Sequence, residues 1–418
     1  MQGPFVKSHY VRFFIATVFL HFSGLKFRKW RKEIEEIWSI TPSEYKKYLN
    51  HMIKVNKLMD GAGNVVQSLD ELPEAIPTSK KILNSRLDQA RSSGKMFSRF
   101  TSGTTGTRTK VFLTKNEIGR LLAVRDYCLC HHGVNLGDRE ARFWGGRAKT
   151  LSTVIKDFVL NRKSFFVSNN NLMRTLIELS NWKPDYVYGY SSYLILLSKF
   201  MVDNDIKIQG VKLVVCTAEQ ILPEQKKIIA QAFGSKVVEE YGSTEFDIIG
   251  FEDANGDLRI ANPWLLVESC ENSIMITDVY RRSQSFVKYE IGDAANVNFK
   301  LSKGFGGEYI ISNLEGRNIN QYAYDLNGNG FRASEFSLAL NKYFDKYSDI
   351  FDFVIVQRKT GHFEFYCSAE PRVGFGEFCV WLKQYINTKT KMQVVVLPAK
   401  IGPLDEFAGK RSYFIRCT

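Results

Sequence analysis

Short apolar runs alternate with longer amphipathic segments in the middle of the chain, and this alternation constrains the fold more than any other feature. Residues 184–190 and 211–219 are rich in tyrosine or valine, which favour strands. Each run is followed by a segment with apolar residues at helical spacing, over 191–202 and 222–233. This pattern is typical of a parallel sheet covered by helices, so the sequence predicts an α/β core.

The first part of the chain has a pattern that predicts helices. Thr41 can cap a helix, Pro42 stands at the first helical position, and Glu44 has the spacing of a capping box. We expect residues 1–95 to form an N-terminal helical part of the large domain and residues 96–316 to form its core. The last stretch of that core, from about residue 260, is rich in β-forming segments.

The chain changes again after residue 316. The remaining residues predict a helix, a hairpin that turns near Gly361, a second helix and a final strand, over 334–347, 352–370, 378–386 and 392–398. We therefore expect residues 317–418 to form a small, lid-sized α+β C-terminal domain beside the large domain, whose sheets are covered by helices.

Composition narrows the class of protein. The chain has 418 residues, of which 44% are hydrophobic and 24% charged, as expected of a globular enzyme or binding protein. Its formal net charge of +13 favours acidic partners such as nucleotides, carrier proteins or an anionic membrane surface. A nucleic-acid partner is disfavoured because the chain has no block of consecutive basic residues and no aromatic residues interleaved with basic residues.

The cysteines indicate the compartment. Seven scattered cysteines, an odd number, favour reduced thiols and a cytoplasmic protein over a disulfide framework. The cluster Cys128, Cys130, His131 and His132 has no second ligand pair at zinc-site spacing downstream. We expect these residues to be helix positions that face a core or a cleft, with a zinc site as the alternative.

An apolar run over residues 13–20 lies near the N-terminus. It is too short to cross a bilayer, so we expect no transmembrane segment, and no small-residue cleavage site follows it. We expect a helix that packs on the body of the protein. A signal peptide and a helix lying on a membrane surface are the alternatives.

Residues 100–110 are rich in threonine, with glycine, serine and a closing lysine. Glycine allows backbone N–H groups to converge and hydroxyls add donors, which suits an anion, although the same composition suits an exposed turn. The chain lacks the G-x-x-x-x-G-K-[ST] pattern, which excludes a Walker-type phosphate loop.

Four further segments follow this loop in order, over 237–251, 287–297, 315–320 and 403–414. Together the five motifs resemble those of the adenylate-forming superfamily, in particular the branch of phenylacetate–CoA ligases and CapK-like capsular polysaccharide proteins. The resemblance covers residues 70–418.

The resemblance implies roles for individual residues. The loop that holds the β- and γ-phosphates of ATP would comprise Ser102, Gly103, Thr104, Thr105, Gly106 and Lys110. Around the rest of the nucleotide, Tyr241 would stack on adenine, Gly242 would let the nucleotide approach, and Asp293 would accept the ribose hydroxyls.

The resemblance also implies the catalytic groups. Thr244 and Glu245 would bind the phosphates, with Glu245 as a ligand of Mg²⁺, and Lys410 would be the catalytic lysine of the lid. The resemblance implies that residues 317–418 are a small mobile C-terminal lid domain, and Arg317 would bind the nucleotide at its start. Two weaker assignments follow: Ala218 and Glu219 would line the acyl and nucleotide pocket, while Trp144, Gly145 and Gly146 would either line the acyl side or serve packing.

Three positions depart from the family pattern. Arg108 stands where proline is usual. Lys288 replaces an arginine, so that a guanidinium able to make bidentate hydrogen bonds is replaced by the point charge of an ammonium group. Asn320 replaces the aspartate three residues after Arg317, which puts the second half-reaction in doubt.

The resemblance implies an ATP- and Mg²⁺-dependent, AMP-forming ligase that adenylates a small carboxylic acid. The acyl group would pass to CoA, to the thiol of an acyl-carrier protein or to an amine such as an amino sugar, in capsule or O-antigen polysaccharide biosynthesis. The alternative is a degenerate adenylation fold that acts as a nucleotide-binding partner protein in polysaccharide assembly. The sequence leaves a homodimer open.

Overall fold

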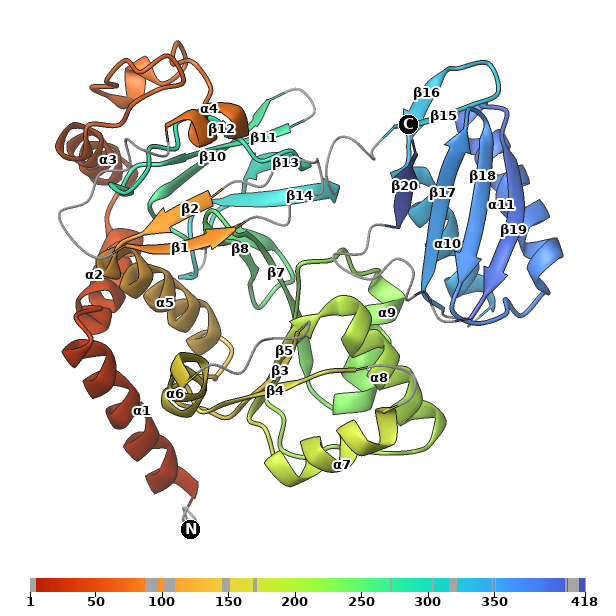
Figure 1. Cartoon of the computed structure of the whole chain (residues 1–418), viewed down its shortest axis with the longest axis horizontal. Coiled ribbons are helices and arrows are strands. Elements are labelled where there is room, and N and C mark those ends of the chain that lie inside the picture. Colours follow the sequence, from red (N-terminus) through yellow and green to blue (C-terminus); the bar gives the residue numbers. More distant parts are fainter. Residues whose placement is uncertain are drawn as a thin grey trace.

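The structure is a computed structural model of the whole chain (Figure 1). The residues that it describes are 5–86, 96–100, 110–144, 151–167, 171–270, 273–302, 304–315, 322–347, 349, 351–402, 404 and 413–417.

Along the chain, helices come first, then alternating strands and helices, then a run of strands, and last a mixed group of strands and helices. The helices are α1 (Phe5–Phe22), α2 (Phe27–Ser39), α3 (Pro42–Asn56), the 3₁₀ turn η1 (Leu69–Glu71), α4 (Lys80–Ser85), α5 (Lys115–Cys130), α6 (Leu151–Val159), α7 (Leu172–Trp182), α8 (Ser191–Asp203), α9 (Pro223–Phe233), α10 (Ser334–Tyr347) and α11 (Phe375–Thr390).

The strands before residue 316 are β1 (Phe97–Phe100), β2 (Lys110–Leu113), β3 (Glu140–Phe143), β4 (Arg162–Phe165), β5 (Tyr186–Tyr190), β6 (Leu213–Thr217), β7 (Lys236–Ser243), β8 (Asp247–Glu252), β9 (Leu258–Ile260), β10 (Leu265–Cys270), β11 (Ser273–Asp278), β12 (Tyr289–Glu290), β13 (Ala294–Phe299) and β14 (Tyr309–Glu315). Those after it are β15 (Tyr322–Tyr324), β16 (Gly330–Arg332), β17 (Phe353–Lys359), β18 (His362–Cys367), β19 (Val395–Ile401) and β20 (Phe414–Arg416).

A nine-stranded sheet organises the large domain, in the order β13-β14-β9-β8-β7-β6-β5-β3-β4. Strands β4, β3, β5, β6 and β7 run parallel, and the strands from β8 onward pair antiparallel. Strands β5 and β6 are followed directly by α8 and α9. The structure therefore confirms the predicted α/β core.

Helices cover both faces of the parallel strands because alternate residues point to opposite sides. Tyr188, Val215 and Val238 belong to a buried cluster that includes residues of α2 and α5. Their sequence neighbours Val187 and Val214 belong to a second cluster with residues of α7, α8 and α9. The sheet is thus the middle of three layers.

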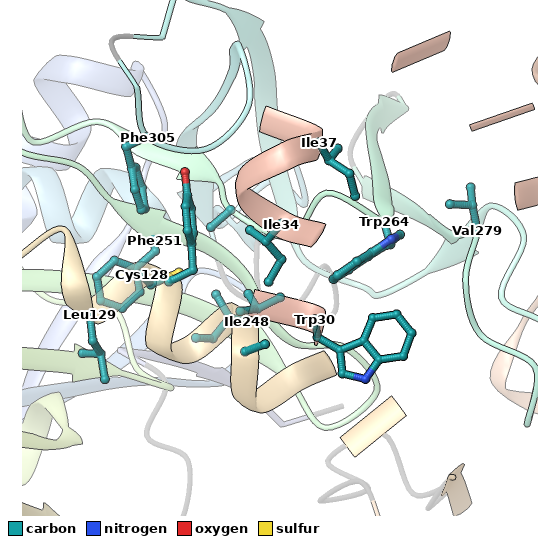
Figure 2. Packing of buried hydrophobic residues seen from close by; sticks show 14 of the residues in the cluster. Trp30, Ile34, Ile37, Cys128, Leu129, Ile248, Phe251, Trp264, Val279 and Phe305 are labelled. Atoms are coloured by element: carbon teal, nitrogen blue, oxygen red, sulfur yellow. The ribbon is translucent and has the colours of Figure 1, made fainter. Parts of the chain in front are cut away.

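Figure 2 shows the first of these clusters, where α2 inserts Trp30, Ile34 and Ile37 beside Trp264. Trp30 and Trp264 meet edge to face with ring centroids 6.2 Å apart, a favoured aromatic geometry. Cys128 is fully buried in the same cluster, as expected for a core position of its helix.

The predicted cap at the start of α3 is confirmed. The backbone N–H of Thr41 donates to the Glu44 carboxylate at 2.9 Å, and the N–H of Glu44 donates to the Thr41 hydroxyl at 3.3 Å. The expected helix over residues 13–20 is also present, within α1, and it packs on the body through Ala16 and Leu20. Across the described ranges, no helix is both long and apolar enough to span a membrane.

The C-terminal elements form their own sheet, in the order β19-β18-β17-β20, with α10 and α11 packed on it. The hairpin β17–β18 turns at Gly361, whose φ of 74° suits glycine. Leu222 of the large domain packs into this core, and the Tyr413 hydroxyl donates to the Gln220 carbonyl at 2.7 Å. The expected domain boundary at 316–317 lies outside the described residues and stays a prediction.

One buried ion pair links α5 to the strand β11. Arg120 and Asp278 are almost fully buried and joined by two hydrogen bonds of 2.8 and 3.1 Å. Burial alone would raise the pKa of Asp278, but the Arg120 guanidinium holds it below its usual value.

Acid should weaken the fold through Asp278. Its depressed pKa means that the ionised carboxylate contributes stability above the pKa of the unfolded chain, about 3.9, and that this is lost as the pH falls through the lower pKa of the folded state. We expect the free energy of unfolding, measured with urea, to fall more steeply below about pH 5 in the native protein than in Asp278→Asn. Asp70→Asn, which alters an exposed pair, should keep the native dependence. Equal slopes for all three proteins would contradict the prediction.

Candidate active site

Four of the predicted positions lie directly after parallel strands or at their ends. Trp144 follows β3, Ala218 and Glu219 follow β6, and Tyr241 lies near the end of β7. Since β3, β5, β6 and β7 are parallel, their carboxyl ends meet at one edge of the sheet. This edge is where open α/β sheets bind ligands, and it is the candidate site.

Tyr241 and Asp293 come from different motifs and meet in the fold. The Tyr241 hydroxyl donates to the Asp293 carboxylate at 3.0 Å, and both side chains are buried. The two residues expected to hold adenine and ribose are therefore brought together.

The turn between β7 and β8 depends on Gly242. A Cβ at this position would lie 2.2 Å from the Asp247 carbonyl oxygen, so a side chain cannot be accommodated. The Ser243 hydroxyl accepts from the Phe246 N–H at 3.2 Å, which closes the turn. Thr244 and Glu245 form this turn, with Thr244 half-buried and Glu245 buried.

Glu245 is oriented by the second motif as well. The Tyr289 hydroxyl donates to its carboxylate at 2.8 Å, and the Arg281 guanidinium donates to its backbone carbonyl. The segments 237–251 and 287–297 are thus joined by two tyrosine–carboxylate bonds, Tyr241 to Asp293 and Tyr289 to Glu245. The sequence did not identify Tyr289 or Arg281 as site residues.

A magnesium ligand at Glu245 is chemically consistent with this geometry. The part of the chain that the structure describes has no group of three His, Cys, Asp or Glu able to hold a metal ion. Mg²⁺ usually needs only one or two carboxylates, because substrate phosphates and water complete its shell. The single buried carboxylate of Glu245, next to the predicted phosphate-binding positions, fits that requirement.

Arg125 of α5 holds the β7–β8 turn through both of its flanks, and this role could not be recognised from the sequence. Its guanidinium donates to Glu240 at 3.0 Å and to Asp247 at 2.8 Å, on the two sides of the turn. Burial alone would lower the pKa of Arg125, but the Glu240 carboxylate raises it well above the usual value. Burial would likewise raise the pKa of Asp247, and Arg125 holds it below its usual value.

Glu219 has a structural task at the same edge. Its carboxylate accepts from the Ser192 N–H at 2.8 Å and its carbonyl accepts from the Ser191 hydroxyl at 3.1 Å. The negative charge therefore lies at the N-terminus of α8, where the helix dipole favours it. Ala218 has a φ of 67°, a backbone conformation that few residues other than glycine adopt.

Of the predicted phosphate loop, residues 100–110, the structure describes the two ends, Phe100 and Lys110. Lys110 begins β2, and its backbone carbonyl accepts from the Gln284 side chain at 3.1 Å. The remaining predicted residues of the site lie outside the described residues: Ser102, Gly103, Thr104, Thr105, Gly106, Arg317 and Lys410, together with Gly145, Gly146, Arg108 and Asn320.

The packing alternative at Trp144 has a clear partner. Its ring lies 4.2 Å from that of Tyr190 and stacks on Tyr188 at 5.9 Å, measured between centroids.

The Lys288 ammonium donates to the Pro73 carbonyl at 2.7 Å, so this departure from the family pattern ties the N-terminal part to the core.

Removing the Arg125 charge should destabilise the protein. Arg125→Ala leaves the buried Glu240 carboxylate and the partly buried Asp247 carboxylate without their cation, so we expect a loss of about 3–5 kcal/mol in the free energy of unfolding, measured with urea. Arg125→Lys should lower the free energy of unfolding by less, because it keeps the positive charge. It should still be less stable than the native protein, because an ammonium group cannot bond both carboxylates as a planar guanidinium does. The control is Arg174→Ala, whose exposed pair with Glu178 should be worth less than about 0.5 kcal/mol. Equal losses for Arg125→Ala and Arg174→Ala would refute the proposed role.

No protein-family model matches the chain. In sequence it is 22% identical over 342 residues to Protein CapK of Staphylococcus aureus, with 75% of this chain and 73% of that protein covered. It is also 30% identical over 154 residues to the indoleacetate–lysine synthetase of Pseudomonas savastanoi, which covers 36% of each protein.

In structure the chain is similar to 2-hydroxyisobutyryl-CoA ligase in its postadenylation state, solved in complex with R3-HIB-AMP. The TM-score is 0.65 at 14% identity, with 94% of this chain and 89% of that chain covered. At this identity the likeness shows the fold. The comparisons confirm the resemblance that the motifs indicated: the chain has the adenylate-forming ligase fold and a CapK-like sequence.

Proposed function

We propose that the chain is an ATP-dependent, AMP-forming ligase that activates a carboxylic acid and transfers the acyl group to CoA, a carrier thiol or an amine. The observation that carries the proposal is the Tyr241–Asp293 hydrogen bond, which joins two nucleotide motifs at the carboxyl edge of the sheet. The relatives support the range of acceptors, since one is named as a CoA ligase and another as a lysine synthetase.

In the first half-reaction, a carboxylate oxygen of the acid attacks the α-phosphorus of ATP. The bond from that phosphorus to the bridging oxygen breaks, and pyrophosphate leaves with the electron pair. Asp293 would hold the ribose, because one carboxylate can accept the Tyr241 hydroxyl and a ribose hydroxyl together. The Tyr241 ring would offer its face to adenine.

The phosphates would be held from two sides. Lys110 and the loop before it would meet the β- and γ-phosphates, while Thr244 and Glu245 would act from the β7–β8 turn. Mg²⁺ bound at Glu245 would neutralise part of the phosphate charge. The Tyr289 hydrogen bond holds the Glu245 carboxylate in one orientation, so that the turn is preorganised for this task.

In the second half-reaction a thiol or amine attacks the acyl carbon, and AMP leaves.

Lys410 would stabilise the charge that builds on the carboxylate and α-phosphate in the first step. Tyr413, three residues after Lys410 in sequence, donates to the Gln220 carbonyl beside Glu219, which supports a role for this segment at the site. Arg317 would bind the nucleotide at the base of the lid domain.

We further propose that the acid is small and that the protein is cytoplasmic. We also propose a role in surface polysaccharide biosynthesis, which the similarity to CapK supports. An amino-sugar acceptor would fit such a role. Arg108 would lie in the loop that holds the β- and γ-phosphates, so this departure bears on the rate of adenylation. Asn320 would lie in the hinge, so that departure bears on the second half-reaction.

The proposal is tested by pyrophosphate exchange into ATP across a panel of carboxylic acids, with and without CoA. At least one acid should support exchange, and Lys410→Ala and Asp293→Ala should each lower it by about 10²-fold or more, because each removes charge stabilisation at the reacting nucleotide. Asp70→Ala, far from the motifs in sequence and exposed, is the control. ATP binding without exchange for any acid would favour a nucleotide-binding partner protein instead.

Two substitutions at one residue separate the ring of Tyr241 from its hydroxyl. Tyr241→Phe keeps the ring and loses the bond to Asp293, so the KM for ATP should rise by less than about tenfold. Tyr241→Ala also loses stacking, which is worth about 1–3 kcal/mol per base, so its KM should rise by a further factor of about ten. Equal KM values for the two variants would argue against adenine stacking on this ring.

A further inference from the structure

Helix α1 is apolar on two sides, and the structure covers one of them. Ala16, Thr17 and Leu20 are buried against the body. The helix projects along one flank of the large domain, with the chain's N-terminus at its far end (Figure 1).

The other side of α1 exposes a row of large apolar side chains. Phe14 is 61% exposed and Phe22 84% exposed, and the full row is Val11, Phe14, Ile15, Phe19 and Phe22. Positions three, four, eight and eleven residues beyond the first lie on one face of a helix. This row is therefore a continuous apolar stripe on α1 that the described residues leave exposed.

Helix α6 extends the stripe. Its exposed apolar residues are Val154, Ile155 and Phe158, the last 63% exposed. The Arg12 guanidinium of α1 lies over the Phe158 ring, 5.2 Å from its centroid, which places the two helices side by side, as Figure 1 also shows. We call these eight residues of α1 and α6 the α1–α6 surface. Exposed apolar side chains that gather on neighbouring helices mark a site of interaction.

The charges around the α1–α6 surface are basic. Helix α1 contains no acidic residue. The exposed bases next to it in sequence or on α6 are Lys26, Arg28, Lys29 and Lys156. Lys115 of α5 packs beside the turn that follows α1, where its Cδ lies 3.6 Å from the place of a Cβ on Gly24. The one acid of α6, Asp157, is paired with Arg162.

We propose that the α1–α6 surface binds the face of an anionic lipid bilayer. Apolar side chains would enter the boundary between headgroups and acyl chains, and the flanking lysines and arginines would meet the lipid phosphates. A second copy of the chain fits less well, since a two-fold interface would set these bases against one another. The helix would lie along the membrane without crossing it, in line with its length and hydropathy.

The proposal does not depend on the ligase activity. The candidate site lies at the carboxyl edge of the sheet and uses no residue of α1 or α6. Membrane contact would therefore bring the ligase to a surface without changing its chemistry, and the two proposals can fail separately.

The test is sedimentation of the full chain with phosphatidylcholine vesicles and with vesicles that also contain phosphatidylglycerol. The native protein should bind the anionic vesicles, less at high salt, and bind phosphatidylcholine weakly. Phe14→Glu with Phe158→Glu should lower the partition coefficient at least about tenfold, because two apolar anchors are replaced by charges of the lipid's own sign. Arg28→Gln with Lys156→Gln should weaken binding to anionic vesicles alone.

Matched controls exclude general effects of the substitutions. Val380→Glu, at an exposed apolar position of α11, and Arg174→Gln, at an exposed basic position of α7, should bind like the native protein. Circular dichroism and pyrophosphate exchange in solution should be native in the Phe14→Glu, Phe158→Glu protein. No binding to anionic vesicles overturns the proposal. Equal binding by that double variant overturns it too, as does a native dimer that the same variant dissociates while vesicles do not bind.

Discussion

The partly buried guanidinium of Arg125 is the group on which the geometry of the candidate site depends. It bonds to Glu240 before the β7–β8 turn and to Asp247 after it, in surroundings where water screens little. Tyr241 and Glu245 lie between those two carboxylates in the sequence, so their positions follow from this contact. Each of them then meets a residue at or after β12, so that the two predicted nucleotide motifs are joined by hydrogen bonds.

The alternation of strands and helices could be predicted because its signal is local. Strands β5 and β6, with the helices after them, are long enough to show their periods in the sequence. Strands β15, β16 and β20 have three residues each, too few to show alternation. Strand β20 exists because Phe414 to Arg416 pair with β17, nearly sixty residues earlier in the chain. Such non-local pairing leaves no trace in a single sequence.

The same limit applies to the candidate site. Tyr241, Gly242, Glu245 and Asp293 could be named because they stand in contiguous motifs. Arg125 could not, since an arginine within an amphipathic helix is ordinary and its partner Glu240 is 115 residues away. The Tyr289 hydrogen bond to Glu245 depends on two turns meeting across the fold, which spacing within either motif does not reveal. The sequence thus allows a prediction of the residues that would meet a ligand, but it does not reveal the residues that hold them in place.

Helix α1 illustrates the opposite case, in which the sequence is ambiguous and the fold decides. A helix that is apolar all round is usually buried, and the sequence predicted a helix packed on the body. Packing covers Ala16 and Leu20 but leaves Phe14 and Phe22 in solvent. Exposed apolar area carries a free-energy cost in proportion to its size, so a second cover would be stabilising. The basic residues that follow the helix, from Lys26 to Lys29, favour a binding partner with negative charge. Part of the chain's formal net charge of +13 is therefore located beside this apolar surface.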